Sequence, residues 1–310
     1  AAGSVVVKKC LMHSNIFSQV HVASRTYSKL EQLKLDCNNN IFIYSLDADI
    51  VEDTIKLIHK IKPKVVINMA LPYQDLAIMD ACLATKTHYL DTANYEPKDT
   101  PKFCYKWQWD YHERFKDAGI LAVLGSGFDP GVTNVFIRYA ADNIFDSIQS
   151  VDIIDCNAGD HGHPFATNFN PEINIREITQ DGKYFNNGDW ITIPAMSVSK
   201  DIEFPTIGSK KAYLLYHEEL ESLVKHFPSI KRIRFWMTFS DSYIEHLNVL
   251  QNVGMTSITP IEVNGTQISP LEFLKEVLPK PSDLSSNYTG KTCIGCRVTG
   301  LISGKEHTKL

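Results

Sequence analysis

The first 130 residues alternate short apolar segments with amphipathic ones, and this pattern restricts the fold more than any other feature of the sequence. Residues 64–69 (KVVINM) and 120–124 (ILAVL) are almost continuously apolar, which is typical of strands buried on both faces. Residues 49–62 instead repeat their apolar side chains at helical spacing. Strands and helices that alternate at this pace predict an α/β fold built on a Rossmann-type, doubly wound parallel sheet.

The same reasoning places further elements in this part of the chain. Strands are also expected at 19–23, 41–45 and 88–90, and helices at 74–85 and 106–118. Asp49 and Glu52 form the capping box expected at the start of the helix over 49–62. Gly119 is the expected glycine just past the end of the helix over 106–118.

Beyond Gly131 the pattern changes to strands separated by longer polar loops. Strands are expected at 151–155, 190–193, 232–239, 256–263 and 293–301, and helices at 133–143, 216–226 and 270–277. This arrangement predicts a mixed α+β second domain. We therefore predict two domains, a Rossmann-type dinucleotide-binding domain over 1–131 and the α+β domain over 132–310.

The composition argues against several classes of protein. A formal net charge of −5 disfavours nucleic acid and anionic membrane surfaces as partners. No run of 18 apolar residues and no signal peptide is visible, which predicts a cytoplasmic protein. Seven scattered cysteines, an odd number, fit reduced thiols in that compartment. Cys293 and Cys296 have no second cysteine or histidine pair at zinc spacing, so we predict no metal site.

Both ends of the chain look incomplete for a fold of this type. Residues 1–7 (AAGSVVV) resemble the close of a glycine-rich turn that runs into a helix, so we expect a strand before them. Gly3 is then the last glycine of a G-x-G-x-x-G turn that binds a pyrophosphate, although a flexible terminal glycine is the alternative. The chain stops in a hairpin-like segment at 301–305, and we expect further residues after it.

The end of the second expected strand carries the residues that would read the ribose of a dinucleotide. Ser24, Arg25 and Thr26 stand there, where an NAD-binding protein places an aspartate or a glutamate. An arginine instead pairs with a 2′-phosphate through charge-assisted hydrogen bonds. The sequence therefore favours NADP over NAD as the cofactor, with a solvated loop arginine as the alternative.

Polar and small residues also follow the other expected strands. Ligands of open α/β sheets bind outside the carboxyl ends of the strands, so these residues are candidates for contact with the cofactor, with ordinary turns as the alternative at each one. They are Asp47, Ala48, Ala70, Leu71, Pro72, Asp91 and Thr92. Asn94, just after the last of these, is a candidate for substrate binding.

Residues 125–132 (GSGFDPGV) fix a tight backbone path that would hold Asp129 rigidly at the domain junction. Asp129 is therefore a candidate catalytic residue, and a helix N-cap or turn aspartate is the alternative. The loop over 155–163 adds Asp160 and His161, suited to binding an ammonium and transferring protons near neutral pH. A metal bound by His161 and His163 is the less favoured interpretation.

Further substrate-binding candidates come from the second domain. Arg176 is a candidate for gripping a carboxylate, with a helix-surface ion pair as an equal alternative. Asn157 and Glu172 are polar candidates near it in the sequence. Residues 216–219 (YHEE) are interpreted as a helix start that is equally suited to a functional and to a surface role.

Seven motifs together resemble the carboxynorspermidine synthase group of the saccharopine dehydrogenase family, over essentially the whole chain. The motifs are 68–75 (NMALPYQD), 91–97 (DTANYEP), 125–132 (GSGFDPGV), 156–162 (CNAGDHG), 169–177 (FNPEINIRE), 216–223 (YHEELESL) and 252–258 (NVGMTSI). The chain departs from that group in carrying only the tail of its glycine-rich turn.

This resemblance implies polyamine biosynthesis. L-aspartate β-semialdehyde would condense with 1,3-diaminopropane or putrescine, and NADPH would reduce the imine. It also implies a homodimer joined through the second domain. Two alternatives stay open at this point: a saccharopine reductase or homospermidine-type synthase with another substrate, and an NADP-binding protein without catalysis.

Overall fold

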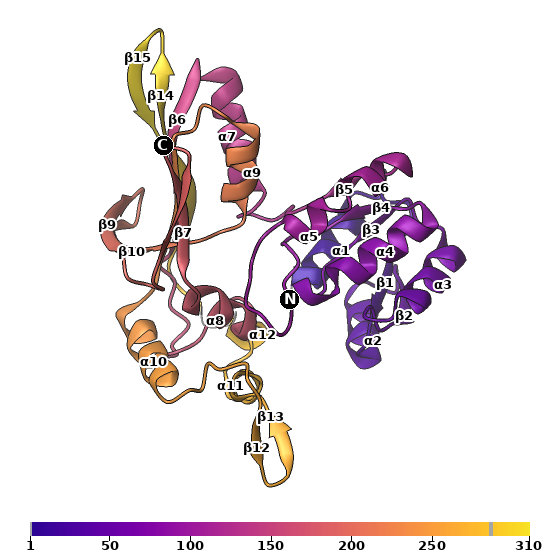
Figure 1. The fold of residues 1–310 in the computed structure, drawn as a ribbon. Helices are drawn as coiled ribbons and strands as arrows, with labels where there is room; N and C mark the ends of the chain where they lie inside the picture. Colours follow the sequence, from indigo (N-terminus) through magenta and orange to yellow (C-terminus); the bar gives the residue numbers. More distant parts are fainter. Residues whose placement is uncertain (1, 285–287) are drawn as a thin grey trace. The chain divides into compact units, whose positions relative to one another are not determined.

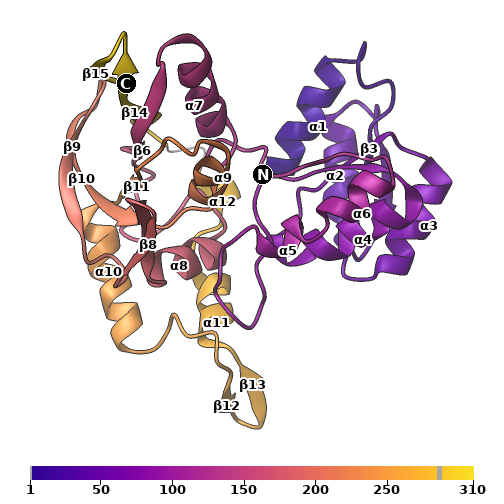
Figure 2. The same cartoon turned by 45° about the horizontal axis from the view of Figure 1, so that its top comes forward.

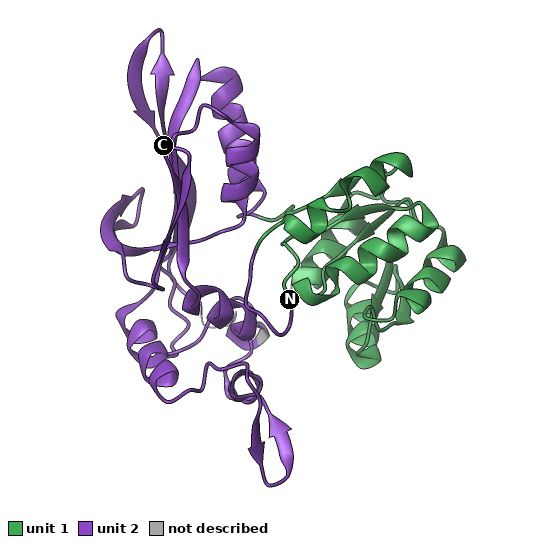
Figure 3. Ribbon diagram, viewed as in Figure 1, with its two compact units in different colours: residues 1–96, 104–127 green, residues 97–103, 128–310 purple. Residues whose placement is uncertain are grey.

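The structure is a computed structural model that describes residues 2–284 and 288–310, and the chain forms two compact units (Figure 3). Unit 1 comprises residues 1–96 and 104–127, and unit 2 comprises residues 97–103 and 128–310. The short segment 97–103 belongs to unit 2 although unit 1 surrounds it in the sequence. The predicted boundary at 131/132 stays a prediction.

Unit 1 contains parallel strands whose carboxyl ends share one edge within each group. β1 (His21–Ser24) pairs with β2 (Phe42–Ser45), while β3 (Val65–Ile67), β4 (His88–Leu90) and β5 (Ala122–Val123) pair in that order. The helices between them are α1 (Ala2–Met12), α2 (Tyr27–Asp36), α3 (Val51–Ile61), α4 (Asp75–Thr85), α5 (Lys106–Trp109) and α6 (His112–Asp117), with a short 3-10 helix at Pro72–Gln74. Strand and helix alternate through the unit, so the predicted α/β class is confirmed (Figure 1).

The core of unit 1 explains which helical positions are apolar. Ile58 of α3 and Met79 of α4 pack with Tyr89 of β4 and Phe115 of α6 in one buried cluster. Lys62 ends α3 and Lys86 ends α4, each in the left-handed conformation.

Among the described residues, no helix combines the length and the apolarity that crossing a bilayer requires.

Unit 2 is built on a mixed sheet of the order β15-β14-β6-β11-β10-β9, with β7 paired to β11 and β8 paired to β7 (Figure 2). β6 lies at its centre, parallel to β11 and antiparallel to β14. The strands are β6 (Ser147–Asn157), β7 (Gly182–Asn186), β8 (Asp189–Ile193), β9 (Ser199–Phe204), β10 (Gly208–Leu215), β11 (Arg232–Thr238), β14 (Thr292–Ile302) and β15 (Lys305–Lys309). A separate hairpin joins β12 (Ile261–Val263) to β13 (Thr266–Ile268).

Five helices bury their apolar faces against one face of this sheet. Val151 and Ile153 of β6 point to that face, where Ile137, Ile175 and Leu220 of three helices meet them. The helices of the unit are α7 (Val132–Asn143), α8 (Pro171–Thr179), α9 (Glu219–His226), α10 (Asp241–Asn252), α11 (Pro270–Val277) and α12 (Pro281–Leu284), of which α7 to α11 supply this core. Side-chain caps start three of them, at Asn170, Ser240 and Ser269.

Several predicted elements differ from the structure. The capping box at Asp49 and Glu52 is wrong, because α3 begins after Ile50 without a side-chain cap. The helix over 106–118 is divided at residues 110–111, although Gly119 follows it with a positive φ as expected. The strand expected over 256–263 is confined to β12. Helices α8 and α10 were not predicted, because their polar residues conceal the apolar face that each one buries.

Candidate active site

Buried polar side chains hold the strand ends of unit 1 in place. Asp91, only 2% exposed, follows β4 and accepts hydrogen bonds from the Gln108 amide (2.6 Å) and the Gly125 N–H (2.7 Å). These bonds tie the turn after β5 to the end of β4. Thr92 is half-buried beside it, and Asn94 is buried with its amide donating to the carbonyl of Tyr95 (2.8 Å). The binding roles of these residues stay predictions.

Side-chain hydrogen bonds also fix the end of β3. The Asn68 amide donates to Asp75 (2.8 Å) and to the Tyr89 hydroxyl (3.0 Å), and its oxygen accepts from the Ala70 N–H (2.9 Å). This fixes the path of the predicted cofactor segment, in which Ala70 is exposed, Leu71 is half-buried and Pro72 is buried. The segment therefore offers an ordered surface at the carboxyl end of β3.

The residues predicted to bind the phosphates of NADP lie at two helix starts. Gly3 is in the first turn of α1, where an added Cβ would stand 3.7 Å from that of Met69, just past β3. β1 ends at Ser24, whose hydroxyl accepts from the N–H of Thr26, the N-cap of α2 (3.4 Å). Arg25 is exposed and makes no hydrogen bond or ion pair with the described residues. Its guanidinium is free to bind an anion.

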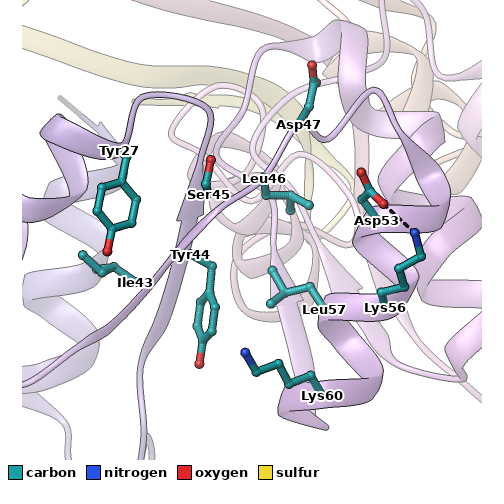
Figure 4. Close-up of a pocket in the computed structure, with 10 residues that line it drawn as sticks. All are labelled: Tyr27, Ile43, Tyr44, Ser45, Leu46, Asp47, Asp53, Lys56, Leu57 and Lys60. Atoms are coloured by element: carbon teal, nitrogen blue, oxygen red, sulfur yellow. Dashed lines mark hydrogen bonds and ion pairs between the residues drawn. The ribbon is translucent and has the colours of Figure 1, made fainter.

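A hollow of about 610 Å³ lies beside β2 and α3 (Figure 4). Ser45, Leu46 and Asp47 line it at the end of β2, and Lys60 lies across it over the Tyr44 ring. Asp47 accepts from the N–H of Asp49 (3.1 Å), which sets the turn that includes the half-buried Ala48. The hollow is a candidate place for the adenine half of a dinucleotide.

The predicted loop of unit 2 is held by the segment that follows residue 287. The Asn157 oxygen accepts from the Tyr288 hydroxyl (2.9 Å) and from the Gly159 N–H (3.1 Å). Asp160 is exposed; its backbone pairs with Thr289 and its carboxylate accepts from the Gly162 N–H (2.7 Å). The ring of His161 lies 5.9 Å from that of His163. The catalytic roles of Asp160 and His161 stay predictions.

Arg176 and Glu172 have structural partners within unit 2. Arg176 is 3% exposed and donates to the carbonyls of Pro97 (2.8 Å) and Lys98 (3.0 Å), which anchors segment 97–103. Glu172 pairs with Lys275 of α11 at 2.9 Å. These contacts give both residues a role in joining elements of unit 2, and their predicted substrate contacts remain untested predictions.

A second group of charged residues lies on the helix side of the sheet of unit 2. We call it the acid cluster: Asp129, Asp155, Glu177, His217, Glu218 and Glu219. His217 lies at its centre, with Nδ1 bound to Glu219 and 3.4 Å from Glu218, and Nε2 3.4 Å from Glu177. Its ring stacks on Phe235 of β11 at a centroid distance of 4.4 Å. Three carboxyl groups therefore contact the imidazole, and Asp129 and Asp155 interact with it electrostatically.

The cluster shifts the acidity of its members. Burial would lower the pKa of His217, but Glu219, Glu218 and Glu177 outweigh it and raise that pKa well above its usual value. Burial raises the pKa of Asp129 to about 6, against the opposing effect of His217. Burial and the Asp129 charge raise the pKa of Asp155 to about 8, and burial raises that of Glu177 to about 7. The cluster therefore holds excess negative charge and shared protons near neutral pH.

Sequence reasoning identified part of this cluster. It selected Asp129, and it left 216–219 open between a functional and a surface role. The N-cap alternative for Asp129 is wrong, since Gly131 is the N-cap of α7. Asp155 and Glu177 were missed. Asp155 follows Val151 and Ile153 at period two on the inward face of β6, so an acid on an otherwise apolar face was the available signal.

Family comparisons agree with this two-unit architecture. Residues 1–123 match the saccharopine dehydrogenase NADP-binding domain, and residues 127–309 match the saccharopine dehydrogenase C-terminal domain. The chain belongs to the saccharopine dehydrogenase family. It is an oxidoreductase of this family, and its first unit is the family's NADP-binding domain.

Two relatives within the family are named for polyamine-related enzymes. A carboxyaminopropylagmatine dehydrogenase from Synechocystis sp. is 55% identical over 99% of this chain and 77% of its own length. A carboxynorspermidine synthase from Vibrio alginolyticus is 40% identical with the same coverage of both chains.

Among solved structures, apo saccharopine dehydrogenase (L-Glu forming) from Saccharomyces cerevisiae superposes with a TM-score of 0.59 at 18% identity. The match covers 87% of this chain and 61% of that one. At this identity the likeness supports the fold: an NADP-binding, Rossmann-like unit followed by a mixed-sheet unit.

The cluster raises the question of a metal, because ligand atoms of His217, Glu218 and Glu219 lie within 4.8 Å of one another. The His217 imidazole already pairs with these two carboxylates, and the absence of a metal stays a prediction. We expect turnover to survive exhaustive chelation, with less than a twofold loss of kcat, and metal analysis to find no stoichiometric ion. Lost activity that Zn²⁺ or Mn²⁺ restores would show instead that the cluster binds a metal.

Proposed function

We propose that this protein is an NADPH-dependent enzyme that condenses L-aspartate β-semialdehyde with a cationic amine and reduces the resulting imine. The acid cluster carries the proposal. A cation taken from water needs paired carboxylates, because burying it alone costs far more than binding returns. The cluster has five carboxyl groups for one imidazolium, so a positively charged substrate would complete its charge balance.

Two members of the cluster support a bound ligand in particular. Glu219 is fully buried and one of its carboxylate oxygens, Oε1, has no hydrogen-bond partner among the described residues. Asp155 is also buried, at 4% exposed. Buried acceptors without donors are costly, and a guanidinium or an ammonium supplies the missing donors.

The cofactor would be held by the strand ends of unit 1. Arg25 would bind the 2′-phosphate, and the start of α1 at Gly3 would face the pyrophosphate, where helix N–H groups favour anions. Bound NADPH supplies the hydride that reduces the imine. The ordered segment Ala70–Pro72 would support the nicotinamide half.

Agmatine is the amine that we propose first. The name of the relative at 55% identity describes agmatine bearing a carboxyaminopropyl group, which has the carbon skeleton of reduced aspartate β-semialdehyde. The planar guanidinium of agmatine pairs with carboxylates through two parallel hydrogen bonds. 1,3-Diaminopropane and putrescine remain the second candidates, favoured by the relative at 40% identity.

The test is a panel of amines with one aldehyde. NADPH oxidation is measured with aspartate β-semialdehyde and agmatine, 1,3-diaminopropane, putrescine or n-butylamine. We expect kcat/KM for agmatine to exceed that for the diamines by about tenfold or more, since one poorly paired charge costs about 1.4 kcal/mol or more. Butylamine, which has no second cation, should be poorest.

Other outcomes separate the alternatives. A higher kcat/KM for a diamine would assign the carboxynorspermidine-type substrate. Turnover only with α-aminoadipate semialdehyde and glutamate would assign a saccharopine reductase. NADPH binding without turnover of any pair would make the protein a nucleotide-binding protein. A homodimer remains a proposal, to be checked by light scattering.

A further inference from the structure

We propose that Glu219 binds the cationic end of the amine substrate, and that Ser222 and Asn134 are positioning residues that hold Glu219 in place. This rests on the proposed function and names the residue that would select a substrate with a second positive charge. Every residue in the argument belongs to unit 2.

Glu219 has a buried acceptor that no group of the described chain uses. It is fully buried in the first turn of α9. One carboxylate oxygen, Oε2, is bound by Nδ1 of His217, whereas Oε1 has no hydrogen-bond partner among the described residues. A guanidinium or an ammonium would supply both the missing N–H donor and a compensating charge. We therefore place the substrate cation at Oε1 of Glu219.

The imidazole that pairs with Glu219 is shared with two other carboxylates. Nδ1 of His217 also lies 3.4 Å from Glu218, and Nε2 lies 3.4 Å from Glu177. An imidazolium carries one positive charge, so it cannot balance all three carboxylates in their ionised form. A second cation bound at Glu219 would reduce the repulsion among them.

Other acids of the unit lack this combination of burial and an unused acceptor. Asp160, which the sequence suggested for an ammonium, is exposed, so a cation beside it stays in water. Asp152 of β6 is 7% exposed, but Arg234 already donates to it through two hydrogen bonds of 2.7 and 2.9 Å. Exposed ion pairs contribute little, and Asp152 already has its counter-ion, so neither residue favours a substrate cation as Glu219 does.

A series of hydrogen bonds between uncharged groups fixes the backbone that carries Glu219. The Ser222 hydroxyl donates to the Glu219 carbonyl (3.0 Å), and the Asn134 amide donates to the Ser222 hydroxyl (2.9 Å). The Asn134 side-chain oxygen accepts from the N–H of Gly131, the N-cap of α7 (3.0 Å). These bonds join the start of α9 to the start of α7, directly after the turn that carries Asp129. They therefore set the position of Glu219 relative to that turn.

The experiment compares an amine that has a second cation with one that has none. We measure kcat/KM with aspartate β-semialdehyde and either the best doubly charged amine of the panel or n-butylamine, and take the ratio of the two values. In the intact chain, Glu219→Gln should lower this ratio roughly 10- to 150-fold, the range for a hydrogen bond to a charged group, chiefly through a higher KM for the doubly charged amine. NADPH affinity should not change. Glu203→Gln on β9, at an exposed position, is the matched control and should keep the wild-type ratio.

Ser222 tests the positioning role separately. Ser222→Ala removes a hydrogen bond between uncharged groups, so it should lower the same ratio about 2- to 10-fold. Ser222→Thr keeps the hydroxyl and should restore the ratio. A purely structural defect would reduce kcat/KM for both amines alike and leave their ratio unchanged.

Two results would overturn the inference. They are a wild-type ratio in Glu219→Gln, and a ratio lowered in Ser222→Ala that Ser222→Thr does not restore. If Glu219→Gln does not fold, Ser222→Ala serves, and an unchanged ratio in that variant refutes the inference. A wild type inactive with every amine refutes the proposed function itself, so the two failures are distinguishable.

Discussion

Replacing His217 with glutamine is expected to destabilise unit 2 by about 3–5 kcal/mol at pH 7.5, the range for removing one partner of a buried ion pair. The imidazolium of His217 offsets the charges of Glu177, Glu218 and Glu219, and its side chain is only 12% exposed. Without it these carboxylates lose the imidazolium that offsets their charge. Urea unfolding of the intact chain, with hydrogen exchange of the β6 amides as the local measurement, gives the change.

The contribution of His217 to the free energy of unfolding depends on pH in a definite direction. The pKa of His217 is raised in the folded state, so its stabilisation is complete below about pH 6.5, its unfolded value, and is lost as pH rises through the folded pKa. Asp129, Glu177 and Asp155 also have raised pKa values, about 6, 7 and 8, so the folded chain keeps protons that the unfolded chain releases above about pH 4. Wild-type stability should therefore fall between about pH 4 and 8.

Protonation of the neighbouring carboxyl groups reduces the destabilisation by His217→Gln at low pH. At pH 5 the neighbouring carboxyl groups can protonate, so His217→Gln should cost less there than at pH 7.5. His226→Gln, on the exposed side of α9, is the control and should stay within about 0.5 kcal/mol of the wild type. An equal cost at both pH values would mean that His217 contributes packing on Phe235 rather than charge.

Arg25→Ala is expected to weaken NADPH binding by about 1.5–3 kcal/mol, or roughly 10- to 150-fold in Kd, because charge-assisted hydrogen bonds fall in that range. Arg25 is exposed, follows β1 directly and has no competing partner among the described residues. NADH, which lacks the 2′-phosphate, should bind the variant as it binds the wild type. Fluorescence titration of both cofactors measures the two Kd values.

Arg25→Lys separates charge from geometry in this contact. A lysine keeps the positive charge but not the planar fork, so it should recover only part of the affinity. Lys29→Ala, two residues into α2, is a nearby charge control that should change the Kd less than threefold. An equal loss for NADPH and NADH would remove Arg25 from the phosphate site.

The local sequence pattern was sufficient to predict a helix or strand where that element shows its own apolar pattern. Residues 64–69 and 120–124 contain β3 and β5 as predicted, but the expected burial on both faces is wrong for β5, because Leu121 and Val123 are 60% and 39% exposed. α11 matches its predicted bounds, since Pro270 and the Ser269 cap mark its start. The resemblance in the seven motifs gave the family, which the domain matches confirm. For the cofactor, the matches extend only to an NADP-binding domain.

The acid cluster could not be predicted as a group from the sequence alone. Its members come from a loop, a strand and two helix segments separated by up to 90 positions, and no local rule brings Asp129, Glu177 and His217 together. Arg176 shows the converse: its residue type suits a substrate carboxylate, yet the fold directs it to the carbonyls of Pro97 and Lys98. The sequence by itself determined the two architectures and the polar strand ends, because those follow from periodicity. The tertiary structure decided which charges share a low-dielectric site, because electrostatic coupling depends on distance and burial rather than on order along the chain.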